Sequence, residues 1–180
     1  MGAYEVTISG FGGQGVLLIG QLLAYAANKA GHTISWLPAY GPEMRGGTAN
    51  CMVVISDGEV NSPQIINPTA VIALNKPSVQ RFEPLIKTGG LLIVNTDLVD
   101  IEIQRKDISV VKIAAGTIAE KLGSNKIVNM VALGAFIKAS GIVSLNAILQ
   151  CLENVIPAHR ASMIEVNAAA IKTGYEAVAE

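Results

Sequence analysis

The residues with the clearest capacity for chemistry form a glycine-rich turn, Ser9-Gly10-Phe11-Gly12-Gly13-Gln14-Gly15. The run matches the pattern G-x-G-x-x-G and lies between a predicted strand and a predicted helix. Glycine permits the tight turn and lets a phosphate approach the backbone closely. The N-terminus of the following helix adds free N–H groups and the positive end of the helix dipole. This context favours contact with a phosphate-bearing ligand.

The residues after the second predicted strand argue against a nicotinamide site that belongs to this chain alone. The dinucleotide-binding fold requires an Asp or Glu there, where the carboxylate binds the ribose hydroxyls. Here the stretch is Trp36-Leu37-Pro38-Ala39-Tyr40, without an acid, and Glu43 lies deeper in the loop. Three interpretations of the turn stay open. They are NAD binding by this chain alone, a close packing turn that can admit a neighbouring subunit's backbone, and a phosphate-bearing ligand shared with partner chains.

A second unusual segment, Tyr40-Gly41-Pro42-Glu43-Met44-Arg45-Gly46-Gly47, places an aromatic residue, an acid and an arginine in a nearly uncharged region. The guanidinium of Arg45 can bind a phosphate or carboxylate with two hydrogen bonds. An internal pairing of Glu43 with Arg45 that stiffens the loop is the alternative. We expect strands one and two to run parallel and end on the same side. The loop and the glycine turn then meet at the edge where α/β folds bind ligands.

The sequence holds few other residues of the kinds that catalyse reactions or bind metals. A four-iron cluster needs four thiolates, and the chain has two cysteines, Cys51 and Cys151. We interpret both as inert core residues. His32 and His159 lack the spacing of metal ligands and are interpreted as a strand-start and a helix-start polar residue. No catalytic residue and no metal ligand is predicted in this chain.

The composition points to partners that cover part of the surface. Apolar residues make up 51% of the chain and charged residues 15%, against about 25% charged in typical soluble domains. A well-packed monomer rich in small residues is the alternative. The net charge of −1 without a basic block argues against nucleic acid as a partner. The longest apolar stretch, 16–27, is too short to span a membrane, and we expect a cytoplasmic protein with reduced thiols.

The periodicity predicts one α/β domain over residues 1–180, a three-layer α/β/α Rossmann-like fold with a mixed, mainly parallel sheet and a helical C-terminal third. Asp57-Gly58 is a hairpin signal, so Val60 and Asn61 are expected to pair back and give the sheet an antiparallel portion. The helix over 16–30 is apolar nearly all round and is expected to be buried on every side. A position between the sheet and a second protein is one arrangement that would achieve this. The expected strands are 4–9, 32–37, 48–56, 71–74, 91–94 and 109–113. The expected helices are 16–30, 79–87, 116–122 and 128–139, followed by a helix capped by Ser144. A last helix is expected with its apolar stripe at Ile164, Ala168, Ile171, Tyr175 and Val178.

Three motifs together resemble those of the gamma subunit of 2-oxoacid:ferredoxin (acceptor) oxidoreductases. They are G-F-G-G-Q-G-V at 10–16, Y-G-P-E-M-R-G-G-T-A-N at 40–50 and V-V-I-S-D at 53–57. Ser62-Pro63 and N-M-V-A-L-G at 129–134 are similar as well, so the resemblance covers essentially the whole chain. The paired motifs at this separation are specific, whereas either one alone is not.

The resemblance implies a subunit of an enzyme that decarboxylates a 2-oxoacid oxidatively, forms an acyl-CoA and passes electrons to ferredoxin. Thiamine diphosphate, Mg²⁺ and 4Fe-4S clusters would be carried by partners, namely thiamine-binding alpha and beta subunits and a ferredoxin-like subunit. Coenzyme A would be a shared co-substrate, and the isolated chain would be inactive. The second motif is more similar to the 2-oxoglutarate and branched-chain types than to the pyruvate type.

Carried onto this sequence, the resemblance places both unusual segments at a partner or at the phosphates of coenzyme A. A stand-alone NAD- or flavin-binding reductase and a pure scaffold without ligand contact are the alternative functions. The residues expected to contact the cofactor are Gly12, Gly13, Gln14, Gly15, Tyr40, Glu43, Arg45, Gly46 and Gly47.

Overall fold

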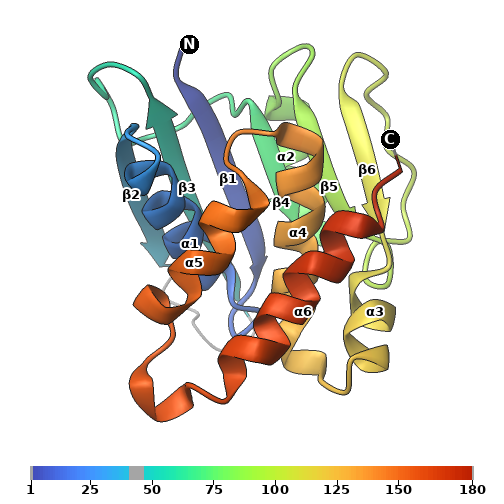
Figure 1. Ribbon diagram of the computed structural model, residues 1–180. Helices are drawn as coiled ribbons and strands as arrows, with labels where there is room; N and C mark the ends of the chain where they lie inside the picture. Colours follow the sequence, from blue (N-terminus) through green and yellow to red (C-terminus); the bar gives the residue numbers. More distant parts are fainter. Residues whose placement is uncertain (1, 41–46, 180) are drawn as a thin grey trace.

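The computed structural model describes residues 2–40 and 47–179. The described part is a six-stranded sheet with helices on both faces (Figure 1). The strands are β1 (Tyr4–Phe11), β2 (Thr33–Tyr40), β3 (Thr48–Ser56), β4 (Ala70–Ala73), β5 (Leu91–Asn95) and β6 (Ser109–Ile113). The helices are α1 (Val16–Lys29), α2 (Lys76–Phe82), α3 (Ala115–Lys121), α4 (Val128–Ser140), α5 (Leu145–Val155) and α6 (Met163–Glu176), with short 3-10 turns at Glu83–Leu85, Asn125–Ile127 and Ala158–Arg160.

The sheet order is β2-β3-β1-β4-β5-β6. β1, β4, β5 and β6 pair in parallel, and β3 is antiparallel to both of its neighbours. The prediction of a mixed, mainly parallel sheet in an α/β fold is therefore confirmed. β1 and β2 run in the same direction as expected, but they are not neighbours, because β3 lies between them.

Two predictions about the antiparallel portion are wrong. Val60 and Asn61 form no strand, since Asp57-Gly58 is a bend that leads away from the sheet. The antiparallel pairing comes instead from β3, which pairs with β2 and β1. The loop predicted from Pro38 also begins too early, because β2 continues to Tyr40. A proline is tolerated there because β2 is an edge strand, where an N–H can be missing without loss of a ladder bond.

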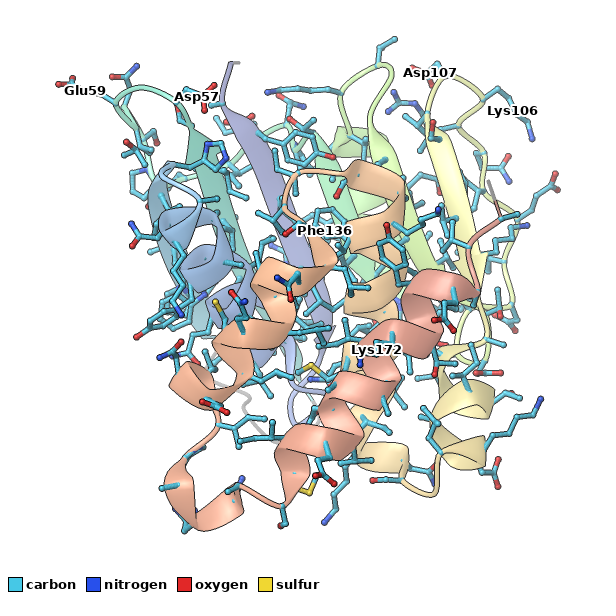
Figure 2. All side chains as sticks on the ribbon, in the orientation of Figure 1. Asp57, Glu59, Lys106, Asp107, Phe136 and Lys172 are labelled. Carbon is cyan, nitrogen blue, oxygen red and sulfur yellow. The ribbon has the colours of Figure 1, made fainter. Side chains whose placement is uncertain are left out.

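The two faces of the sheet carry unequal layers. Helices α1, α3, α4, α5 and α6 pack on one face over the larger core cluster, which contains the fully buried Phe136. Figure 2 shows Phe136 in the interior of this layer. α2 and the segment after β5, including Val99 and Ile103, cover β4 and β5 on the other face. The three-layer arrangement with a helical C-terminal third agrees with the prediction.

Within the described chain the helix buried on every side is α4, whereas the burial predicted for α1 needs a second protein on its open flank and stays a prediction. Every residue of α4 from Asn129 to Ile137 is buried. α1 packs on β1, β2 and β3, and α5 covers one of its flanks. Its other flank stays open, where Tyr25 is 47% exposed.

Two glycines set the distance between α4 and α6. A Cβ at Gly134 would lie 2.0 Å from Ile171 O, and one at Gly174 would lie 2.0 Å from Val131 O. The backbones of the two helices therefore touch, and the buried residues of α6 are Asn167, Ala170, Ile171 and Gly174. All of the predicted apolar stripe of α6 packs against the core, with Ile171 fully buried and its other members partly buried. The contact made by Gly174 was not predicted, because hydrophobic periodicity does not mark glycine as a contact residue.

We expect Gly174→Ala to lower the free energy of unfolding by about 3 kcal/mol, at the upper end of the usual cost of overpacking. The added methyl group must push α6 away from Val131 O, which is backbone and cannot rotate aside. Gly58→Ala is the control, because a Cβ there meets nothing within 4 Å. Urea unfolding of the full chain measures both, and equal stabilities of the two variants would contradict the close crossing.

Candidate functional site

The glycine turn and Gly47, the last residue of the second unusual segment, lie together at the edge of the sheet where β1 ends. Gly12 N donates a hydrogen bond to Gly47 O over 2.9 Å, which joins the two. β1 runs on to Phe11 and pairs there with Thr48, the first residue of β3. The predicted proximity is confirmed for Gly47, and the part of the segment at 41–46 lies outside the described residues.

Packing within the chain explains two of the glycines in the turn. A Cβ at Gly10 would lie 2.7 Å from Gln14 Oε1 and 3.0 Å from Val16 Cγ2. Gly15 has a φ of 73° in the left-handed region, and a Cβ there would lie 2.3 Å from Asn129 Nδ2. The first glycine lets the Gln14 side chain fold back over the strand, and the second lets α1 begin beside α4.

Gly13 differs from these two. Its φ is 93°, which favours glycine, but a Cβ there would meet nothing within 4 Å. The tip of the turn is therefore open, and its backbone is accessible to a ligand or to a neighbouring chain.

The N-terminus of α1 carries no side-chain cap within the described residues. The N-cap is Gly15, and the first turn holds no acidic residue. The N–H groups of Val16, Leu17 and Leu18 have no partner inside the helix, as at any helix start. Free N–H groups and the helix dipole make this end favourable for an anion.

Two hollows flank Gly13. The first, a mostly apolar cavity of about 430 Å³, lies between the turn, the start of α1 and the ends of β2 and β3. The second, a more polar cleft of about 710 Å³, lies beside the ends of β5 and β6. The apolar cavity is lined by Phe11, Gly12, Gly13, Gly15, Val16, Leu17, Leu18, Gln21, Ala39, Gly47, Thr48 and Ala49. The polar cleft is lined by Gly13, Gln14, Asn95, Asp97, Leu98, Gly116, Thr117, Glu120, Asn125, Lys126, Val128 and Asn129.

Buried polar side chains that sequence reasoning missed support the turn from behind. Ser9 contacts Asn50 and Ser78, Ser78 donates to Asn75, and Asn75 donates to Gln14. Ser9, Asn75 and Ser78 are each 1% exposed. One signal was available, because Asn75 directly follows a buried apolar strand, at the edge where α/β folds place ligand-contacting residues.

The predicted site residues fall into three sets. Gly12, Gly13, Gln14, Gly15 and Gly47 are brought together around the two hollows. Tyr40 is the last residue of β2 and pairs with Ala49. The remaining three, Glu43, Arg45 and Gly46, lie outside the described residues, as does their predicted pairing.

The cysteines and histidines have the structural roles that were predicted. Cys51 and Cys151 are buried and free. Burial raises the pKa of the Cys51 thiol to about 12, so at neutral pH it is an unreactive neutral group. His32 precedes β2 and lies 2.8 Å from Asp57 through its Nδ1. His159 lies in the exposed 3-10 turn before α6.

Among the described residues, no group of three or more His, Cys, Asp or Glu side chains is placed to hold a metal ion. Those described residues therefore include no cluster of side chains that fits Mg²⁺ or an iron–sulfur cluster. None of the described helices is both long and apolar enough to cross a membrane.

The sheet order weakens the nicotinamide interpretation further. In a dinucleotide-binding fold the acid that binds the ribose ends the strand next to β1. Here β3 occupies that place, so β2 lies two strand spacings, roughly 10 Å, from β1. An acid at the end of β2 would be too far from the turn for this contact.

Fold and turn together define a Rossmann-like α/β domain with an open glycine turn at the carboxyl edge of its sheet. Residues 5–177 match the family described as pyruvate ferredoxin/flavodoxin oxidoreductase. The chain belongs to this family, and the predicted resemblance is confirmed.

Individual relatives agree. The 2-oxoglutarate synthase subunit KorC of Methanothermobacter marburgensis is 37% identical over 98% of this chain and 97% of the relative. The ketoisovalerate oxidoreductase subunit VorA of the same organism is 40% identical over 79% of this chain, and the match spans only 29% of the length of VorA. The gamma subunit of a keto/oxoacid ferredoxin oxidoreductase from Geobacter sulfurreducens has a similar structure, with a TM-score of 0.86 and 31% identity over 98% of this chain and 96% of that one.

We expect Gly15→Ala to lower the free energy of unfolding by about 2–3 kcal/mol and Gly13→Ala by only about 1 kcal/mol. Both substitutions strain a positive φ, but only the first drives a methyl group into the buried Asn129. Urea unfolding of the two variants tests this, and an equal loss would show that Asn129 moves aside freely.

Proposed function

We propose that this chain is the gamma subunit of a thiamine-diphosphate-dependent 2-oxoacid:ferredoxin oxidoreductase. The enzyme decarboxylates a 2-oxoacid oxidatively, forms an acyl-CoA and passes electrons to ferredoxin. The observation that carries the proposal is the family match over residues 5–177, together with a KorC relative aligned over nearly its whole length. The single domain over residues 1–180 predicted from the sequence is part of this proposal.

The substrate we propose is 2-oxoglutarate or a branched-chain 2-oxoacid rather than pyruvate. The loop motif at 40–50 supports this choice. The names of the two relatives, a 2-oxoglutarate synthase subunit and a ketoisovalerate oxidoreductase subunit, agree with it. The pocket for the 2-oxoacid would lie in other subunits.

The chain would pack on thiamine-binding alpha and beta subunits, with a ferredoxin-like subunit in the same complex. Thiamine diphosphate, Mg²⁺ and 4Fe-4S clusters would be held by those partners and would supply the decarboxylation and electron transfer. The open flank of α1 supports a packed partner, because Phe11 and Tyr25 are exposed there in a region nearly free of charge. VorA supports it as well, since there the matching part belongs to a longer chain.

The role of this chain toward coenzyme A would be to hold the phosphates and orient the thiol toward the acyl group formed in the partner subunits. Free N–H groups at the start of α1 and the open backbone at Gly13 support the phosphate contact. The proposed contact residues are Gly12, Gly13, Gln14, Gly15, Tyr40, Glu43, Arg45, Gly46 and Gly47.

Reconstitution of the complex tests whether activity requires the partner subunits. We expect the purified chain alone to reduce no ferredoxin with any 2-oxoacid and coenzyme A, and the complex with its partners to turn over with 2-oxoglutarate or a branched-chain 2-oxoacid. Turnover by the isolated chain would overturn the proposal. A rise in melting temperature with NAD or FAD would instead favour the stand-alone reductase.

Replacing Arg45 tests the ligand role of the second unusual segment. In the reconstituted complex, Arg45→Ala should raise KM for coenzyme A about 10-fold or more with little change in kcat, because a charged hydrogen bond contributes roughly 1.5–3 kcal/mol. Arg160→Ala, in the exposed 3-10 turn, is the matched control. An unchanged KM in Arg45→Ala would favour the scaffold alternative for this loop.

A further inference from the structure

The side chain of Gln14 folds back over the glycine turn and is held by its oxygen. Oε1 accepts a hydrogen bond from Phe11 N at 2.6 Å and another from Asn75 Nδ2 at 3.3 Å. An amide oxygen has two lone pairs, so both of its acceptor sites are used. Gly10 allows this arrangement, because it leaves the space that Oε1 occupies.

Asn75 is fixed in turn by α2, which it caps. Its Oδ1 accepts from Ser78 N at 3.0 Å and from Ser78 Oγ at 2.7 Å. Its Nδ2 must therefore face Gln14. Ser78 Oγ also lies 2.8 Å from Ser9 Oγ, and Ser9 contacts Asn50 of β3. Two strands, β1 and β3, and α2 with its N-cap thus hold one amide in place.

The nitrogen of the Gln14 amide, Nε2, is left without a partner in the described chain. Nε2 makes no hydrogen bond to any residue that the structure describes, and Gln14 lines the polar cleft beside Gly13. Turning the amide over would set its N–H₂ against two donors, Phe11 N–H and the Asn75 amide. The surrounding residues therefore fix Nε2 as a hydrogen-bond donor on the cleft side.

We propose that Gln14 is a specificity-determining residue that recognises an acceptor oxygen of the ligand, and that Asn75 and Ser78 are positioning residues that orient it. The identity of the ligand as coenzyme A rests on the proposed function. The matching part of coenzyme A is a phosphate or carbonyl oxygen, since a fixed donor rejects another donor.

The surroundings of Nε2 favour a phosphate. Gly13 N donates no hydrogen bond within the described chain, and Lys126 lines the same cleft. The carboxylate of Asp97 is engaged at the start of α3, where it accepts from Thr117 N at 2.8 Å and from Thr117 Oγ1 at 2.9 Å. Glu120 also lines the cleft, so the lining holds two carboxylates and one ammonium group, and the phosphate assignment rests on the two N–H donors, Nε2 and Gly13 N.

Gln14→Glu separates ligand recognition from folding. Its carboxylate keeps an acceptor for Phe11 N and Asn75 Nδ2 but replaces the donor by a negative oxygen. In the reconstituted complex we expect KM for coenzyme A to rise roughly 10- to 100-fold, with kcat and melting temperature nearly unchanged. Gln150→Glu, an exposed change of the same charge on α5, is the control. An unchanged KM in Gln14→Glu overturns the proposal.

Asn75→Asp tests the positioning role, because Asn75 does not line the cleft. Its second carboxylate oxygen would face Gln14 Oε1 and force the Gln14 amide to turn over, which presents an acceptor to the cleft. KM for coenzyme A should rise as in Gln14→Glu while kcat at saturation is retained. Asn146→Asp on α5 controls for charge. Equal KM values in Asn75→Asp and the control overturn the positioning role.

The orientation can be measured on the full chain without turnover. In side-chain amide NMR, the Asn75 N–H₂ should be protected from solvent exchange and the Gln14 N–H₂ should exchange rapidly, then shift with coenzyme A or inorganic pyrophosphate. A protected Gln14 amide, or no shift with either probe, overturns the proposal. Turnover of the wild-type complex without coenzyme A would instead refute the proposed function, and pyrophosphate would still decide the inference.

Discussion

The close passage of β1 into α1 is the constraint on which the rest of this edge depends. Gly10 must lack a side chain so that Gln14 can fold back, and Gly15 must be left-handed so that α1 can start beside Asn129. These requirements tie the turn to the end of β4 and the start of α4. The packing and ligand interpretations of the turn are therefore compatible, because tight packing on one side leaves Gly13 rigidly presented on the other.

Most of the fold could be predicted from the sequence, because its strands and helices carry strong local signals. Ser144 accepts a hydrogen bond from Ala147 N at 3.1 Å, as its position before an apolar helix predicts. The insertion of β3 between β1 and β2 could not be predicted. Strand order depends on pairing across the sheet. Asp57-Gly58 indicated that β3 pairs with the residues after it, whereas β3 pairs with β1 and β2. α2 begins three residues before its predicted start because the Asn75 side chain caps it.

Only part of the candidate site could be predicted from the sequence. The glycine pattern can be recognised in the sequence, because glycine is required there at fixed spacing. The buried polar side chains that support the turn cannot be recognised in the same way. Ser9 contacts Asn50, 41 residues away in the sequence, and Ser78, 69 residues away. Such contacts exist only once the sheet order is known. A buried serine or asparagine in isolation resembles any capping residue, and its role follows from the partner that the fold supplies.

The distribution of charge explains why this edge suits a shared site. Asp57, Glu59, Lys106 and Asp107 lie on loops at the opposite edge of the sheet (Figure 2). At the glycine edge an apolar cavity and a polar cleft meet at Gly13. A ligand with an apolar arm and a charged end can lie across this junction, with each part in matching surroundings. Covering the apolar side with another protein desolvates no charged group of α1 before Lys29. Under the proposed function, this edge would complete a site whose chemistry is supplied by partner subunits.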